Sequence, residues 1–340
     1  MPRLSQVIKS ERRQIGVLHT MEDNNAFGDV RNSNYELTDF GGMFLTSAPH
    51  FCDGRTYPGL SGYVQWFKPV KPRPISVTLI HGGGGQGSEF LTTPDGRPGW
   101  VHDFLRAGFT VFVLDRPGHG RNSWNSEVLG PHTPYPDYET LYPRFVEPKA
   151  SSLWSEAINH NQWPDHDPVA GDRFMASQGV MATNLVSAQK HVEVIAPQLF
   201  EITGDTILVS HSAGGPCGWA LAAMGGPRVK AVAAVEPLGY PGLEHPLGVF
   251  ENGLCVSQFS GLHDPYQRPI AFVTGQATWM RGANLRASKY LQEQNYNVTH
   301  FLLEEYGIWG NGHMLISEKN SSDIAKLIIS WLDKEVGSTL

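Results

Sequence analysis

Strand-like and helix-like segments alternate along most of this 340-residue chain, and their order restricts the fold more than any other feature. Each predicted strand is a short run rich in Val, Ile and other apolar residues, and several run into glycine-rich turns. The six predicted strands are Ile75–Ile80, Thr110–Leu114, Thr206–Ser210, Val229–Val235, Ile270–Thr274 and Val298–Leu303. Apolar strands separated by helices predict an α/β fold, in which a mainly parallel sheet carries helices on both faces.

Five segments between or after these strands have the apolar spacing of helices. They are Trp100–Ala107, Val180–Gln198, Gly214–Met224, Arg281–Gln294 and Ser322–Lys334. Gly108 is expected to end the first of them, and Ser321 or Ser322 to cap the last.

Residues 121–171 break the alternation with repeated prolines among many aromatic side chains. The segment is too apolar for a free linker and too rich in proline for long helices, so we predict a lid or cap insertion. The alternative is an irregular surface segment packed on the body of the protein. The predicted organisation is then an N-terminal extension with edge strands (1–55) and an α/β core (56–120 and 172–340) that this insertion interrupts.

Composition excludes several classes of function. The net charge is −7 and no basic cluster is present, so we expect no nucleic-acid partner. Every apolar run is far shorter than the roughly 18 residues that cross a bilayer, so we expect no membrane segment. The N-terminus mixes charged and apolar residues without the core of a secretion signal, which predicts a cytoplasmic protein.

Metal and cofactor chemistry has little support in the sequence. The three cysteines, Cys52, Cys217 and Cys255, are scattered and form no Cys-x-x-Cys pair. The histidines show no His-x-x-x-His spacing. The glycine cluster after Ile80 lacks Gly-x-x-x-x-Gly-Lys and has no acid placed for a ribose. We therefore expect neither a metal nor a cofactor.

The segment Val209–Gly215 places Ser212 between a predicted strand and a predicted helix. A serine on such a sharp turn takes an unusual backbone conformation, so the residues two before and two after it must be small. Ser210 and Gly214 meet this condition, although glycine is more usual at the first position. We predict a nucleophile elbow with Ser212 as the nucleophile.

A serine hydroxyl needs a base to activate it and a third group to orient that base. His313 is the predicted base, because it ends a glycine-rich loop directly before the last helix. His300 lies inside a predicted strand, His119 lies in an earlier loop, and His211 beside the nucleophile is expected to be structural.

The orienting acid is predicted to be Glu236. It directly follows the strand Val229–Val235, and Pro237 fixes the turn after it. No carboxylate follows the next strand within Gly275–Trp279, and Asp264 is the alternative acid. An oxyanion is expected to bind the backbone N–H groups of Ala213 and of Gly82 or Gly83.

The glycine loop, the elbow serine, the acid and the late histidine occur in the chain order of the α/β-hydrolase superfamily, which the chain resembles from about Tyr57 to its C-terminus. Four segments further resemble a small subset of bacterial serine esterases: Thr92–Trp100, Leu208–Ser212, Val235–Pro237 and Gly310–Met314. In that subset the triad acid is a glutamate after the sixth strand, so the resemblance also implies Glu236.

The resemblance implies the α/β-hydrolase fold, hydrolysis of carboxylic esters and a sizeable insertion covering the site. The esterase has paired cysteines after the His-Gly of its oxyanion loop where this chain has Gly83 and Gly84, so substrate preference does not carry over.

The expected function is therefore serine-dependent hydrolysis of a small-molecule ester through an acyl-enzyme. The aromatic insertion predicts a compact apolar or aromatic substrate, held by Trp124, Tyr135, Trp154 and Trp309. Two alternatives stay open: a lactonase, thioesterase or acyltransferase with the same triad, and a protein that binds or cyclises a ligand without covalent catalysis. The protein could also form a homodimer.

Overall fold

The computed structural model describes residues 35–240 and 267–337 in full. Between these ranges it describes the backbone of four two-residue strands, which are Glu244–His245 (β9), Gly248–Val249 (β10), Val256–Ser257 (β11) and Gly261–Leu262 (β12). Most of the predicted N-terminal extension, the alternative acid Asp264 and Cys255 lie outside the described residues.

An eight-stranded sheet forms the centre of the protein, with the strand order β1-β4-β6-β5-β7-β8-β13-β14. The last six strands of this order run parallel to one another. Strand β4 is antiparallel to its neighbour β6, and β1 is antiparallel to β4. The strands are β1 (Leu37–Thr46), β4 (Ser61–Pro69), β5 (Ser76–Ile80), β6 (Val111–Asp115), β7 (Thr206–His211), β8 (Val229–Val235), β13 (Ile270–Thr274) and β14 (Val298–Leu302). All six strands expected from the sequence are present, and the mainly parallel sheet is confirmed.

Helices cover both faces of the sheet, as predicted. Ile207 and Val209 of β7 belong to the apolar cluster that contains the side chains of α2 and α10, whereas Leu208 belongs to the cluster of α7, α8 and α9. This alternation follows from the two-residue period of a strand and explains why these strands are apolar throughout. The helices are α2 (Trp100–Arg106), α7 (Leu185–Thr203), α8 (Gly214–Gly225), α9 (Arg281–Glu293) and α10 (Ser321–Glu335).

Two predicted helix starts are wrong. Helix α7 begins at Leu185 and not at Val180, because the Asn184 side chain accepts a hydrogen bond from the Ser187 N–H and caps the helix there. Helix α10 begins at Ser321, so this serine lies inside the helix. Asn320 occupies the cap position, but its side chain exchanges hydrogen bonds with Asn311 and does not cap the helix.

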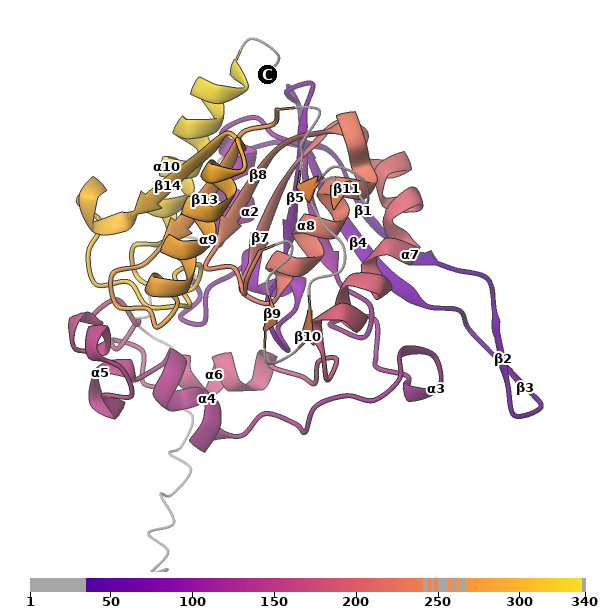
Figure 1. The fold of residues 1–340 in the computed structure, drawn as a ribbon, viewed down its shortest axis with the longest axis horizontal. Helices are drawn as coiled ribbons and strands as arrows, with labels where there is room; N and C mark the ends of the chain where they lie inside the picture. The colour runs from indigo at the N-terminus through magenta and orange to yellow at the C-terminus, as the bar shows by residue number, and fades with distance from the viewer. Residues whose placement is uncertain are drawn as a thin grey trace, which may run out of the picture.

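The N-terminal part of the described chain adds antiparallel strands at one edge of the sheet. Strand β1 pairs with β4, and between them β2 (His50–Cys52) and β3 (Arg55–Tyr57) form a hairpin that extends to the right in Figure 1. Strand β4 has no counterpart among the predicted strands, because its apolar residues are interrupted by Ser61, Gln65 and Lys68.

The segment between β6 and α7 contains only short helices. They are α3 (Ser126–Leu129), α4 (Tyr138–Phe145), α5 (Pro148–Ser151), η2 (Ser155–Asn159) and α6 (Ala170–Ser177). In Figure 1, α4, α5 and α6 lie together below the sheet. Three further 3₁₀ turns are η1 (Gly87–Phe90), η3 (Gly226–Arg228) and η4 (Leu303–Tyr306).

Asp115, the last residue of β6, connects the sheet to two loops. Its buried carboxylate accepts hydrogen bonds from the N–H of Gly87 at 2.6 Å and from the N–H and Nε of Arg121 at 3.1 and 2.7 Å. Charge-assisted hydrogen bonds of this kind are strong when they are shielded from water. The carboxylate therefore fixes both the glycine-rich loop after β5 and the start of the segment after β6.

Replacing this carboxylate is expected to destabilise the protein strongly. In Asp115→Ala the three donors lose their acceptor, so the free energy of unfolding should fall by about 3 kcal/mol. Urea denaturation measures this change. The control is Asp333→Ala, which removes the exposed ion pair with Arg73 and should cost less than about 1 kcal/mol. Equal losses in the two variants would contradict this role of Asp115.

Candidate active site

Ser212 lies on the turn between β7 and α8 with φ of +54°, the left-handed conformation expected at an elbow. Its N–H donates to the carbonyl oxygen of Val235, and its own carbonyl accepts from Gly215 and Leu238. The chain is tightly packed here. A Cβ atom on Gly214 would lie 2.4 Å from the His81 carbonyl oxygen, and one on Gly82 would lie 2.6 Å from Ser212 Cβ. Glycine is therefore required at position 214, as the sequence predicts, and also at position 82.

Ser210, the departure from the usual glycine two residues earlier, is accommodated by helix α8. A Cβ atom on Gly218 would lie 2.8 Å from Ser210 Oγ, so the missing side chain of Gly218 leaves the space that the serine hydroxymethyl group fills. Ser210 is fully buried, and its hydroxyl has no hydrogen-bond partner among the residues that the structure describes. The elbow tolerates a serine because a glycine faces it.

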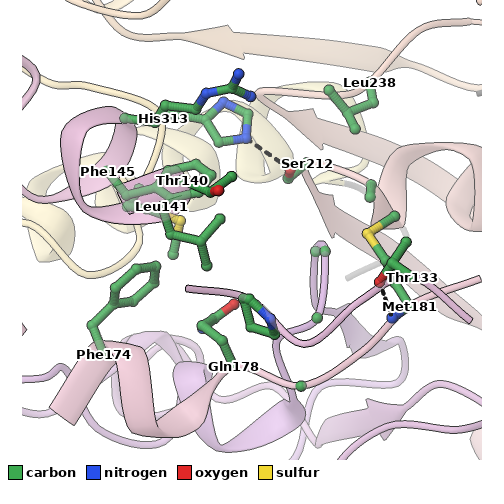
Figure 2. Close-up of a pocket in the computed structure, with 18 of the residues that line it drawn as sticks. Thr133, Thr140, Leu141, Phe145, Phe174, Gln178, Met181, Ser212, Leu238 and His313 are labelled. Atoms are coloured by element: carbon green, nitrogen blue, oxygen red, sulfur yellow. Dashed lines mark hydrogen bonds between the residues drawn. The ribbon is translucent and has the colours of Figure 1, made fainter. Parts of the chain in front are cut away.

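Ser212, His313 and Glu236 form one chain of hydrogen bonds. The Ser212 hydroxyl donates to His313 Nε2 at 2.7 Å, and His313 Nδ1 donates to Glu236 Oε2 at 3.1 Å. Figure 2 shows the first of these bonds above the pocket. The three residues come from the end of β7, the loop after β14 and the end of β8, so the structure brings together all three predicted residues.

Glu236 occupies a left-handed position, with φ of +50°, directly after β8. Its carboxylate is fully buried and accepts hydrogen bonds from Thr278 Oγ1 at 2.6 Å and from the Gly275 N–H at 2.7 Å, in addition to His313. Three donors around one carboxylate favour its charged form. Thr278 and Gly275 lie in the loop after β13, which contains no acid. They instead position Glu236, which follows the neighbouring strand β8.

Burial sets the protonation of the histidine. Desolvation lowers the pKa of His313, and the nearby negative charge of Glu318 opposes this shift only in part. The imidazole is therefore neutral, and its Nε2 can accept a proton. Burial also raises the pKa of Glu236, and the hydrogen bonds from Thr278 and Gly275 oppose this shift. The Trp279 ring stacks on the imidazole, with ring centroids 4.4 Å apart, and restricts its rotation.

His211 supports the histidine loop, in agreement with the structural role expected for it. Its Nε2 lies 2.9 Å from the His313 carbonyl oxygen, and its ring is buried. Burial lowers the pKa of His211 to about 3, so this imidazole is neutral.

The glycine-rich loop after β5 lies beside Ser212 and offers backbone N–H groups. Arg116 Nη2 donates to the Gly83 and Gly82 carbonyl oxygens at 2.7 and 3.1 Å, and His119 Nε2 lies 3.1 Å from the Gly83 oxygen. Gly83 has φ of +31°. Among the described residues no acceptor takes the N–H of Gly83 or of Ala213, and both residues line the pocket. Both N–H groups are therefore available to an acceptor bound in the pocket.

A pocket of about 660 Å³ opens in front of Ser212 and His313. Side chains of the segment after β6 form much of its wall, and Figure 2 shows Thr140, Leu141, Phe145 and Phe174 around the opening. Further lining residues are Met181, Leu238, Trp279, Met280 and Met314. The wall is therefore mainly apolar, as is usual for a small-molecule pocket.

Of the four aromatic residues predicted to hold substrate, Tyr135 alone lines this pocket. Trp124 packs among His119, His132 and His191 and donates to the Gly130 carbonyl. Trp154 donates to the Ala277 carbonyl and contacts the ring of Trp279, and Trp309 is 54% exposed. The prediction for these three tryptophans is corrected. Phe145, Phe174 and Trp279 are the aromatic residues that take their place.

Glu318 is a buried group of the site that the sequence did not single out. Its Oε1 accepts from the Gly312 N–H at 2.8 Å and lies 3.0 Å from His160 Nε2, and its Oε2 accepts from Asn311 Nδ2 at 2.7 Å. Two of these partners directly precede His313, and the third comes from the segment after β6. One carboxylate thus connects the histidine loop to that segment.

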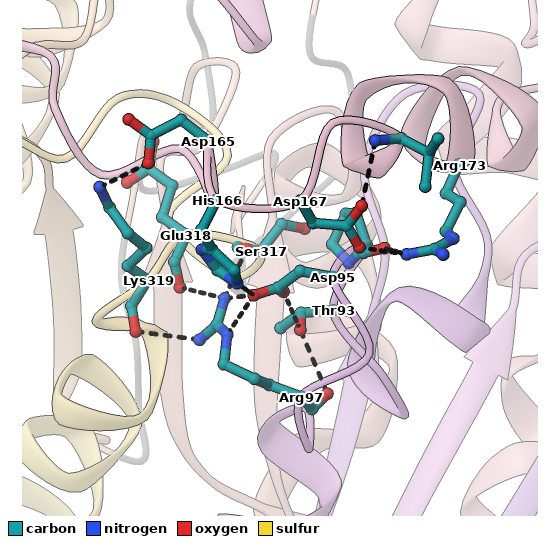
Figure 3. Close-up of polar contacts among 12 residues, drawn as sticks. Thr93, Asp95, Arg97, Asp165, His166, Asp167, Arg173, Ser317, Glu318 and Lys319 are labelled. Atoms are coloured by element: carbon teal, nitrogen blue, oxygen red, sulfur yellow. Dashed lines mark hydrogen bonds and ion pairs between the residues drawn. The ribbon is translucent and has the colours of Figure 1, made fainter. Parts of the chain in front are cut away.

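Arg97 holds Glu318 in place from the other side (Figure 3). Its guanidinium donates to the carbonyl oxygens of Ser317, Glu318 and Lys319, and it pairs with the buried Asp95 at 2.6 Å. The segment Thr92–Trp100, which resembles the bacterial esterases, therefore acts structurally by anchoring the loop that follows His313.

Other kinds of site find little support in the described part of the chain. The one group of side chains there that could hold a metal ion, Cys52, Asp53 and Glu127, is mostly exposed and does not line the pocket. No helix in the described ranges is long and apolar enough to cross a membrane.

Comparison with known proteins gives the family. A family model described as the alpha/beta hydrolase fold matches residues 75–252, just over half of the chain. The chain therefore belongs to the α/β-hydrolase fold family.

Two similar proteins extend this finding. The chain is 28% identical to a probable secreted lipase, phiG, of Fungal sp. (strain ATCC 74256), in an alignment that covers 90% of this chain and 92% of the relative. The structure of a bacterial esterase matches with a TM-score of 0.62 and 22% identity, over 88% of this chain and 97% of that one. The similarity to the bacterial esterase structure supports the fold.

Removing the Glu318 carboxylate is expected to loosen the histidine loop. In Glu318→Ala, the Gly312 N–H and the Asn311 side chain lose a buried acceptor, so the free energy of unfolding should fall by about 3 kcal/mol. Thermal and urea denaturation measure this loss. The control is Glu305→Ala, which removes an exposed carboxylate from η4. A loss for Glu318→Ala as small as that for the control would show that the contacts contribute nothing.

Proposed function

We propose that the protein is a serine hydrolase that cleaves carboxylic esters through an acyl-enzyme. The observation that carries the proposal is the chain of hydrogen bonds from the Ser212 hydroxyl through His313 to Glu236, at the wall of a pocket. The name of the lipase relative supports an ester as the substrate.

The first half of the reaction acylates the serine. Ser212 Oγ attacks the ester carbonyl carbon while His313 Nε2 takes the hydroxyl proton, and Glu236 stabilises the imidazolium through Nδ1. The N–H groups of Ala213 and of Gly83 or Gly82 stabilise the oxyanion of the tetrahedral intermediate. Its collapse breaks the bond to the alcohol oxygen, which receives the proton from His313.

The second half releases the acyl group. A water molecule gives a proton to His313 Nε2 and attacks the acyl carbonyl, so that a second tetrahedral intermediate forms against the same N–H groups. When this intermediate collapses, Ser212 leaves with the proton held by His313. The products are a carboxylic acid and an alcohol, and the enzyme returns to its starting state.

The pocket wall favours a compact substrate with apolar or aromatic parts. Leu141, Phe145, Phe174 and Met181 would bury such groups, and burial supplies roughly 25 cal/mol for each Å² of apolar surface. Residues 121–171 would serve as the lid of this pocket. Lactone opening, thioester cleavage and acyl transfer can use the same Ser212, His313 and Glu236. A cytoplasmic location and a homodimer stay predictions.

The role of Ser212 is tested by Ser212→Ala with p-nitrophenyl acetate as substrate. Because the nucleophile is lost, kcat should fall by roughly 10⁴-fold or more, while folding stays intact. A fluorophosphonate probe should label the unmodified protein on Ser212 and leave the variant unlabelled. Ser187→Ala, which changes a serine of α7 outside the pocket lining, is the matched control. Undiminished turnover by Ser212→Ala would exclude this serine as the nucleophile. Failure of the probe to label Ser212 in the unmodified protein would favour a non-covalent binding function.

The pH dependence of kcat/KM reports the base. Protonated His313 cannot accept the serine proton, so activity should be lost as the pH falls through the pKa of His313. Since burial lowers that pKa, the midpoint of the acid limb is expected below 6.5, the value for a free imidazole. A midpoint at or above 6.5 in the profile for p-nitrophenyl acetate would contradict the buried, neutral state of this histidine.

A further inference from the structure

The pocket contains a carboxyl group that ester hydrolysis does not use. Glu89 belongs to η1 and is 8% exposed, and it lines the same pocket as Ser212. It lies on the side of the glycine-rich loop, whereas Glu236 and Glu318 lie behind His313. A carboxyl group in a mainly apolar wall is costly to bury unless hydrogen bonds satisfy it.

Within the described part of the chain, one of the two carboxyl oxygens of Glu89 has a hydrogen-bond donor. Gln178 Nε2 donates to Glu89 Oε1 at 2.8 Å and to Ser177 Oγ at 2.9 Å. These two contacts fix the carboxamide orientation. No donor among the described residues reaches Glu89 Oε2 or the carbonyl oxygen of the Gln178 side chain. Both residues line the pocket, and Figure 2 shows Gln178 there. Two acceptor oxygens are therefore left for a ligand.

The position of these acceptors is fixed relative to the glycine-rich loop. The Gly179 N–H donates to the Gly84 carbonyl at 2.7 Å, and a Cβ atom on Gly84 would lie 1.9 Å from the Gly179 oxygen. A Cβ atom on Gly85 would lie 2.4 Å from Glu89 Oε1, so the loop packs directly on the carboxyl group. A substrate group that is hydrogen-bonded to Glu89 would thus lie at a fixed distance from the ester carbonyl that the N–H groups of Gly83 and Ala213 would bind.

The other charged residues of the lining are differently placed. Asp137 and Arg144 come from the start of α4 and its last turn. Arg144 is exposed, so water solvates its guanidinium group. Glu89 is the buried carboxyl group of the described lining, and the apolar residues Leu141, Phe145 and Phe174 contribute no donor for it.

We propose that Glu89 and Gln178 form a subsite for a hydrogen-bond donor of the substrate, so that the ester cleaved here carries a hydroxyl group in addition to its apolar part. This inference rests on the proposed ester hydrolysis and specifies its substrate class. Burial raises the pKa of Glu89 to about 7, which suits a neutral hydroxyl better than it suits a cation, because the carboxyl group is then only partly charged near neutral pH.

Matched ester pairs that differ by one hydroxyl group test the subsite. Ethyl 6-hydroxyhexanoate and ethyl hexanoate place the hydroxyl on the acyl side, and 5-hydroxypentyl acetate and pentyl acetate place it on the alcohol side. Hydrolysis is followed by titration of the released acid. We expect kcat/KM to favour the hydroxylated member of one pair by about tenfold, as for one buried hydrogen bond to a partly charged carboxyl group. Ethyl 6-aminohexanoate tests a charged donor in the same position, and a stronger preference for it would overturn the assignment of the subsite to a hydroxyl group.

Variants of Glu89 show whether the preference comes from this group. In Glu89→Leu the ratio of kcat/KM within the pair should fall to about one, and in Glu89→Gln, which keeps an acceptor oxygen without the charge, it should fall only in part. Fluorophosphonate labelling of Ser212 reports whether each variant keeps its site. Glu139→Leu, which changes an exposed carboxylate of α4 outside the pocket lining, should keep the full ratio.

Two results would overturn the subsite. One is equal kcat/KM within both pairs in the unmodified protein, and the other is the same preference in the protein and in its Glu89 variants. In either case Ser212-dependent hydrolysis of the plain esters would leave the proposed function standing. Both proposals fail together if no member of any pair is cleaved in a Ser212-dependent way.

Discussion

The site depends on one buried chain of hydrogen bonds, which joins the Ser212 hydroxyl, the His313 imidazole and the Glu236 carboxylate. The three groups come from positions that only the parallel sheet brings together, because the carboxyl ends of β7, β8 and β14 lie at one edge. Ser212 and Glu236 both take left-handed backbone conformations, which cost energy and persist only where the surroundings enforce them. The folded structure must therefore supply the interactions that hold both residues in these conformations at this edge of the sheet.

A set of buried polar groups behind the site provides that enforcement. Glu318 holds the loop before His313, His211 contacts the carbonyl of His313, and Arg116 holds the carbonyl groups of the glycine-rich loop. None of these side chains belongs to the hydrogen-bond chain itself. They fix the backbone, so that in the proposed mechanism the reacting groups need no rearrangement when charge develops in the transition state. The segment after β6 shares in this support through His160.

The sequence predicts the core well and the surroundings of the site poorly. Runs such as Val229–Val235 are buried on both faces, so their composition alone identifies them, and the strand-turn-helix context identifies Ser212. Glu318 gives no comparable signal, because its partners His160 and Asn311 meet it only in the folded chain. Trp124 likewise lies outside the pocket lining, since an aromatic residue in a proline-rich segment packs equally well away from a substrate.

Direct observation of the acyl-enzyme tests the central claim, that the buried chain of hydrogen bonds makes Ser212 a nucleophile. The protein is mixed with a p-nitrophenyl ester, quenched in acid within the first turnover, and digested for peptide mass spectrometry. The account predicts a peptide whose mass is raised by the acyl group, with the modification on Ser212. Rapid release of p-nitrophenol with no acyl group on Ser212 at any quench time would contradict it.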